Sequence, residues 1–139
     1  MPYKFYVCEF VNTKYPLSDP NKVFVKFGIT HHMDVMDRFN PLVDDGYAKK
    51  YDDWKITCKF SVACRTKEQA EQLEKHWLCT VFPNPGPTKV WVESYLGLSD
   101  NQMYRDNTGI TELRLLTVKQ ARWVYYTLHQ QKINKELAC

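Results

Sequence analysis

The chain has 139 residues, of which 44% are hydrophobic and 14% aromatic. This length fits one domain, and the apolar content suffices for a packed core, which excludes an intrinsically disordered chain. The net charge of +3 is too small to indicate nucleic-acid binding by itself.

Two apolar runs near the N-terminus predict a long-looped β-hairpin. Alternation in residues 4–10 places Tyr6 on one face of the first strand, and in residues 22–30 it places Lys26 and Gly28 on a common face of the second. A glycine inside a strand often marks a close approach by a ligand or another backbone. We therefore expect a ligand or another part of the backbone to approach the sheet closely at Gly28.

The next predicted elements are a short helix and a strand. An amphipathic segment over residues 33–39 ends before Asn40-Pro41, because a residue that precedes proline avoids helical dihedral angles. Residues 54–64 form the clearest strand, which we expect to be central or to have one covered face. The alternating apolar side chains predicted to share a face are Ile56, Cys58, Phe60, Val62 and Cys64.

Two capping-box patterns predict the longer helices. Residues 66–69 (T-K-E-Q) open the first, and Glu74 lies about 20–40° from its apolar stripe, at the border of the buried face. Residues 117–120 (T-V-K-Q) open a final helix that ends near Asn134, after a strand-like run over residues 110–116. The stripe of the first helix consists of Ala70, Leu73, Trp77 and Val81.

A tyrosine strand, a K-F-G strand, an arginine helix and a glutamate helix follow one another in residues 4–96. This order resembles the GIY-YIG nuclease superfamily, in the branch whose second motif reads K-I-G. The resemblance implies an α+β fold with a small, mainly antiparallel three-stranded sheet flanked by helices. Residues 97–139 would be an extra strand and helix packed on that core within a single domain, 1–139. The implied activity is metal-dependent DNA endonuclease cleavage, by nicking or double-strand cutting, with Mg²⁺ or Mn²⁺ as cofactor, as in phage and mobile-element relatives.

The resemblance implies catalytic roles for side chains on the hairpin and the short helix. Tyr6 would act as general base or orient the attacking water; the alternative is an aromatic residue that packs on its neighbours. Lys26 stands where the main pattern has tyrosine, and would contact a phosphate or act as a base; the alternative is a solvated strand lysine. Arg38, ten positions after Gly28, would clamp the scissile phosphate, unless it only stabilises the last turn of its helix.

The metal ligand implied by the resemblance is Glu74, with Glu71 as the second choice. One carboxylate beside waters and phosphate oxygens suits Mg²⁺. The alternative for Glu74 is an ion pair with a lysine or arginine, since a carboxylate at an apolar border is costly unless compensated. His31 would assist proton transfer; alternatively, His31 and His32 are exposed residues of a turn.

The positive charge is unevenly distributed. Residues 103–139 hold six Lys and Arg against three Asp and Glu, whereas residues 1–102 hold thirteen of each. Lys119 and Arg122 are three positions apart on the final helix and therefore neighbours on its surface. We predict that they contact DNA phosphates, so that replacing both lowers the salt dependence of binding.

The cysteines indicate a reducing compartment. Their number is odd, and none forms a C-x-x-C pair, so we expect no zinc site and a cytoplasmic location. We expect no signal peptide, and no apolar run approaches membrane-spanning length, so no membrane partner is expected. The five are Cys8, Cys58, Cys64, Cys79 and Cys139.

Two other functions compete with the nuclease. The first is a catalytically degraded module of the same fold that holds DNA or a protein, and the second is an unrelated α+β interaction domain. If the resemblance holds, the first two strands are antiparallel neighbours and Tyr6 and Arg38 open onto one cleft. Convergence of Tyr6, Lys26, Arg38 and Glu74 on one concave face would disfavour the unrelated domain.

Overall fold

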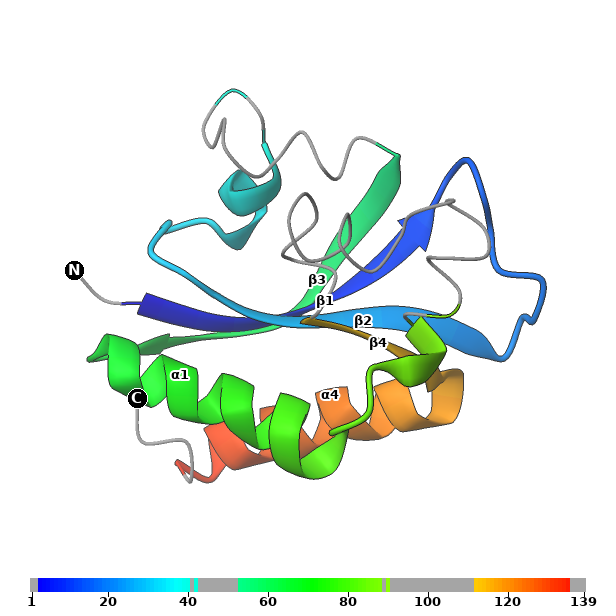
Figure 1. Ribbon diagram of the computed structural model, residues 1–139. Coiled ribbons are helices and arrows are strands. Elements are labelled where there is room, and N and C mark those ends of the chain that lie inside the picture. Colours follow the sequence, from blue (N-terminus) through cyan, green and yellow to red (C-terminus); the bar gives the residue numbers. More distant parts are fainter. Residues whose placement is uncertain (1–2, 41, 43–52, 89, 91–111, 136–139) are drawn as a thin grey trace.

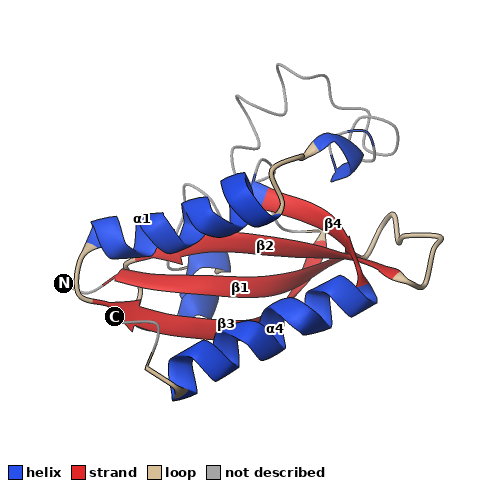
Figure 2. Cartoon of the chain, turned by 90° about the horizontal axis from the view of Figure 1, so that it is seen from below, coloured by secondary structure: helices blue, strands red, loops and turns tan. Residues whose placement is uncertain are grey.

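The computed structural model describes residues 3–40, 42, 53–88, 90 and 112–135. An antiparallel sheet in the order β3-β1-β2-β4 is crossed on one face by α1 and α4 (Figure 2). The predicted α+β class is confirmed. The elements are β1 (Tyr3–Asn12), β2 (Lys22–Thr30), the 3₁₀ helix η1 (Val35–Phe39), β3 (Trp54–Cys64), α1 (Lys67–Lys75), the π-helix η3 (His76–Val81), β4 (Leu113–Thr117) and α4 (Val118–Ile133).

Within the described part of the chain, the sheet has four strands rather than three. The extra strand expected near the C-terminus is β4, and it pairs with β2 along residues 22–26, where Lys26 opposes Leu113. Pairing with β4 satisfies backbone groups that β2 would otherwise present at an edge. The strand is short, so it covers only the first half of β2.

Strands β1 and β2 are antiparallel neighbours, as the sequence predicts. Tyr6 opposes Gly28 and Cys8 opposes Lys26, so these four residues lie on one face, because directly opposed residues point the same way. Residues 5–8 of β1 all have zero exposure. Both faces of the strand are therefore covered.

The sheet separates two hydrophobic cores. The core beneath α1 and α4 includes Phe27 and Trp77, whose rings stack with centroids 5.8 Å apart. The core on the opposite face includes Tyr6 and Val35 of η1, and η1 lies on that side of the sheet (Figure 1). Tyr6 thus belongs to a packed core.

A β-bulge in β3 overturns the prediction that its apolar residues share one face. Val7 pairs with Phe60 but Cys8 pairs with Cys58, which leaves Lys59 as an extra residue. One extra residue turns every side chain beyond it to the other face. β3 is also an edge strand of the described sheet, not a central one. Phe60, Val62 and Cys64 face the helical core, and Trp54, Ile56 and Cys58 face the other.

Both predicted capping boxes lie at helix starts. The Thr66 side chain accepts a hydrogen bond from the Gln69 amide. At the final helix, the Thr117 hydroxyl accepts from the backbone N–H of Gln120, and the Gln120 side-chain oxygen accepts from the backbone N–H of Thr117. The segment predicted as a helix over residues 33–39 is the shorter η1. Within the described ranges, no helix is both long and apolar enough to cross a membrane.

The first helix widens into the π-helix η3 after Lys75, and a buried arginine contacts its end. Arg114 of β4 donates to the Phe82 carbonyl at 2.8 Å and to the Leu78 carbonyl at 3.2 Å. The last carbonyls of a helix lack intrahelical partners. Arg114 therefore fixes the C-terminal end of this helix against the sheet.

Candidate functional site

Tyr6 is enclosed between a glycine and an aromatic ring. A Cβ atom placed on Gly28 would lie 2.5 Å from both Cζ and Oη of Tyr6, so a larger residue would force the ring to move. Phe39 of η1 covers Tyr6 edge-on, with ring centroids 5.8 Å apart. The close approach predicted at Gly28 is therefore made by an aromatic side chain.

The Tyr6 hydroxyl is buried and has no hydrogen-bond partner among the described residues, which is rare for a buried polar group. Burial raises the pKa of Tyr6 to about 12, against the lowering effect of the nearby Lys26 charge. At neutral pH this side chain is therefore a neutral hydroxyl that can donate and accept hydrogen bonds. Its chemistry favours water orientation over action as a general base.

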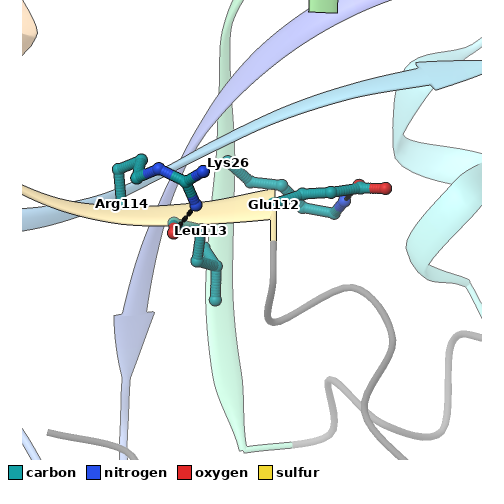
Figure 3. A network of polar contacts seen from close by, with 4 residues as sticks. All are labelled: Lys26, Glu112, Leu113 and Arg114. Atoms are coloured by element: carbon teal, nitrogen blue, oxygen red, sulfur yellow. Dashed lines mark hydrogen bonds and ion pairs between the residues drawn. The ribbon is translucent and has the colours of Figure 1, made fainter. Parts of the chain in front are cut away.

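Lys26 is buried rather than solvated. It has zero exposure, and its ammonium group forms an ion pair with the Glu112 carboxylate. The Nζ atom also lies 5.6 Å from the centroid of the Tyr6 ring, within range of a cation–π contact. Figure 3 shows the ends of the Lys26 and Glu112 side chains together, whereas the Arg114 guanidinium lies apart from this ion pair and donates to the Leu113 carbonyl. The alternative of a solvated strand lysine is thus excluded.

Glu74 lies half-buried on α1, at the border of the apolar stripe, as predicted. Burial raises its pKa to about 7; the negative charge of Glu112 adds to this rise and Lys26 opposes it. The side chain makes no ion pair or hydrogen bond with any described residue. Glu71, the second choice, is exposed and pairs with Lys67 at 3.8 Å. Glu74 is thus the carboxylate with more to gain from a cation.

Arg38 is half-buried on η1, next to the Phe39 ring that covers Tyr6. Its positive charge acts to lower the pKa of the Tyr6 hydroxyl, but the effect of burial, which raises that pKa, is larger. The cleft expected between the two is not found in the described part of the chain, because Tyr6 has zero exposure. The Phe39 ring packs against Tyr6 where the cleft was predicted.

Three other predicted residues lie apart from this cluster. His31 is exposed and stacks on His32, with ring centroids 4.4 Å apart. Lys119 and Arg122 are exposed on α4, on the opposite side of the sheet from η1 (Figure 1). The sheet therefore separates them from Tyr6, and their contact with DNA stays a prediction.

Sequence reasoning missed Glu112, the ion-pair partner of Lys26. No motif surrounds it, and the two residues are 86 positions apart. The available signal was Lys26 itself, because a lysine flanked by apolar residues in a strand is almost never buried without a carboxylate nearby. Because Lys26 was interpreted as either a solvated or a phosphate-binding residue, no carboxylate partner was predicted for it.

The carboxylates of this cluster bear on metal binding. Among the described residues, no group of three or more His, Cys, Asp or Glu side chains could hold a metal ion. The charge of Glu112 raises the pKa of Glu74, the charge of Lys26 lowers it, and Lys26 forms an ion pair with Glu112. Mg²⁺ is commonly held by one or two carboxylates together with waters and substrate phosphates. These two side chains fit that requirement.

Two cysteine side chains lie on the same face of the sheet as Tyr6. Cys8 and Cys58 oppose each other across β1 and β3, and the Cys58 thiol donates to the Phe60 carbonyl at 3.6 Å. A hydrogen bond from Cys8 lowers the pKa of Cys58 to about 7 and raises that of Cys8. Cys58 is therefore the more reactive thiol of the pair.

Alkylation of Cys58 by iodoacetamide should be half-maximal near pH 7, because the thiolate is the reacting species. The Cys8→Ala variant should shift this midpoint upward, since the thiolate loses its hydrogen-bond donor. Peptide mass spectrometry of pH-stepped reactions measures both profiles, with the exposed Cys79 as the reference thiol. A Cys58 midpoint that does not move in Cys8→Ala would contradict this account.

A pocket of about 180 Å³ lies at the loop end of the β1–β2 hairpin, beside Phe10 and Phe24, and none of the clustered residues lines it. The candidate site is instead a buried tyrosine and lysine bordered by an arginine and two carboxylates. Its members come from β1, β2, η1, α1 and the residue that precedes β4. Comparison of the chain with models of protein families, with curated proteins and with solved structures finds no match.

Proposed function

We propose that this chain is a metal-dependent DNA endonuclease of the GIY-YIG type. The observation that carries the proposal is electrostatic: Lys26 acts on both Tyr6 and Glu74, and Arg38 acts on Tyr6. Glu74 on α1 lies on the helical side of the sheet, and Tyr6 and η1 lie on the other side (Figure 1). The charge of Lys26 therefore links groups on the two sides. The proposal includes a cytoplasmic location, where buried thiols remain reduced.

The side chains would divide the work of phosphodiester hydrolysis. Arg38 would bind the scissile phosphate and balance its charge, and the neutral Tyr6 hydroxyl would orient the attacking water. Glu74 would hold Mg²⁺ or Mn²⁺, with Glu112 as a second carboxylate. When bound, such an ion stabilises the leaving 3′ oxygen. Because Phe39 covers Tyr6, η1 must shift before DNA reaches the hydroxyl.

A binding module without catalysis is the second candidate. The enclosure of Tyr6 by Gly28 and Phe39 favours it, because a fully buried hydroxyl cannot meet a phosphate without movement. The ion pair of Lys26 with Glu112 favours it as well, since a neutralised lysine is a weak phosphate ligand. The two candidates have the same fold. They differ in whether the protein cleaves the DNA that it binds.

A plasmid-nicking assay separates them. Supercoiled plasmid is incubated with the protein in Mg²⁺, in Mn²⁺ and in EDTA, and relaxed and linear forms are resolved on a gel. The nuclease predicts relaxed or linear product in either metal and none in EDTA. If the protein retards the plasmid in a mobility-shift assay but cuts it in neither metal, the binding module is the function.

Tyr6→Phe should separate the catalytic role of the hydroxyl from its structural role. The free energy of unfolding should change by less than about 1 kcal/mol, because the hydroxyl has no described partner to lose. Nicking should fall about 100-fold or more if the hydroxyl positions the water. Urea unfolding and initial nicking rates are measured on the same preparation. A variant that nicks at the wild-type rate would remove Tyr6 from the mechanism.

A further inference from the structure

The outer face of α4 carries two exposed aromatic rings between cations. At about 100° per residue, Lys119, Arg122, Trp123 and Tyr126 fall within about 100° of one another around the helix. They lie on the side opposite to the residues that the helix buries. Those buried residues are Ala121, Val124 and Leu128.

Both rings are accessible, and one of them is held in place. Trp123 is 49% exposed and Tyr126 is 67% exposed. The Trp123 ring meets Trp77 at 5.7 Å and Phe82 at 6.5 Å between centroids, at steep interplanar angles. These contacts order the indole without covering it. Tyr126, one turn further along, takes no part in the hydrophobic core.

The charge on this helix is of one sign. Residues 118–135 contain four lysines and arginines and no aspartate or glutamate. Neither Lys119 nor Arg122 forms an ion pair with any described residue. The helix therefore presents cations that no carboxylate among the described residues compensates, beside two exposed aromatic rings.

We propose that the outer face of α4 binds single-stranded nucleic acid. Bases would stack on Trp123 and Tyr126 while Lys119 and Arg122 contact the phosphates, which is how sequence-tolerant single-strand sites are built. A duplex keeps its base faces stacked internally and cannot use the rings in this way. A second copy of the chain would bring cation against cation across a symmetric contact. The sheet separates this surface from Tyr6, so the proposal stands apart from the proposed nuclease function.

The test measures binding of a fluorescently labelled oligo(dT) and of a labelled duplex by anisotropy, across a salt series. Tyr126→Ala should weaken oligo(dT) binding on the order of tenfold and leave duplex binding unchanged. Lys119→Ala with Arg122→Ala should weaken binding of both and lower the salt slope by about 1.4 on the single strand. Tyr126 is chosen over Trp123 because its removal leaves the contacts with Trp77 and Phe82 intact. Circular dichroism confirms that each variant is folded.

A matched control lies in the loop between β1 and β2. There Lys14 lies over the ring of Tyr15, which is 38% exposed, so this pair offers the same residue types off the helix. Tyr15→Ala should bind oligo(dT) like the wild type. Equal binding by Tyr126→Ala and wild type would overturn the stacking proposal, as would no binding of oligo(dT) at low salt. Self-association in sedimentation that Tyr126→Ala abolishes would overturn it in favour of a protein contact.

Discussion

Glu74→Gln should reduce plasmid nicking by several orders of magnitude while the protein stays folded. Glutamine nearly preserves the shape of the side chain, so its contacts beside the apolar stripe survive. It removes the negative charge that a hard divalent cation needs, and stabilisation of the leaving oxygen is worth several kcal/mol. Initial nicking rates in Mg²⁺ measure the loss. Glu71→Gln is the matched control, since that exposed carboxylate lies one turn earlier on α1 and should nick like the wild type.

The same variant has a pH signature that does not depend on activity. The pKa of Glu74 is raised from 4.5 to about 7 in the folded chain, so between these values the folded state binds more protons than the unfolded state. Stability therefore falls as pH rises through this window. Glu74→Gln removes that fall, and it should melt at a higher temperature than the wild type at pH 8 but not at pH 4. The gain should be on the order of 1 kcal/mol, because solvent screens part of the effect.

Two other results for Glu74→Gln would contradict these expectations. If Glu74→Gln melts earlier than the wild type at pH 8, the carboxylate is half of an ion pair. If it also nicks at the wild-type rate, Glu74 is not the metal ligand. Addition of Mg²⁺ should raise the melting temperature of the wild type and not that of the variant, because an ion that binds only the folded state stabilises it.

Glu112→Gln should destabilise the protein by about 3 kcal/mol, the largest stability effect expected of a single change here. Its carboxylate compensates the charge of Lys26, whose side chain is 1% exposed. Glutamine cannot supply the negative charge that faces this buried ammonium group, and removing one partner of a buried ion pair costs more than the pair gains. Urea unfolding measures the loss. The surface pair of Lys67 and Glu71, with 54% and 48% exposed side chains, is the control, and Glu71→Gln should change stability by less than about 1 kcal/mol.

A double-mutant cycle completes this test. Lys26→Met together with Glu112→Gln should recover much of the stability lost in Glu112→Gln, because no charge is then left buried. Losses that simply add would show that Glu112 does not compensate Lys26. Far-UV circular dichroism verifies that all three variants retain the fold.

Local signals predicted most of the fold. The faces of β1 and β2, the capping boxes at Thr66 and Thr117 and the stripe that borders Glu74 each depend on residues close in sequence. The bulge at Lys59 was invisible, because the apolar residues on both sides of it recur at every second position. The extra residue shows only against the partner strand β1, which lies about 50 positions earlier in the chain.

The candidate site was predicted only in part, for a related reason. The motif order predicted Tyr6, Lys26, Arg38 and Glu74. The charge of Lys26 acts on both Tyr6 and Glu74, but Glu74 lies on the helical side of the sheet and Tyr6 and η1 lie on the other side. The motif order gave no hint that Lys26 is buried, because burial of β2 on that face depends on β4 and η1. The Lys26–Glu112 pair joins residues 86 positions apart, and no periodicity or spacing rule reaches that far.

The bulge in β3 also affects how the protein behaves at high concentration. A long, regular edge strand offers unpaired backbone groups on which another chain can add, and such edges promote aggregation. β3 has 11 residues and lies at an edge of the described sheet. The residue at its middle that has no partner on β1 is Lys59, whose ammonium group lies 3.7 Å from the Glu9 carboxylate. A charged interruption there breaks the regular spacing of hydrogen-bonding groups, so the strand is a poor template for fibril growth.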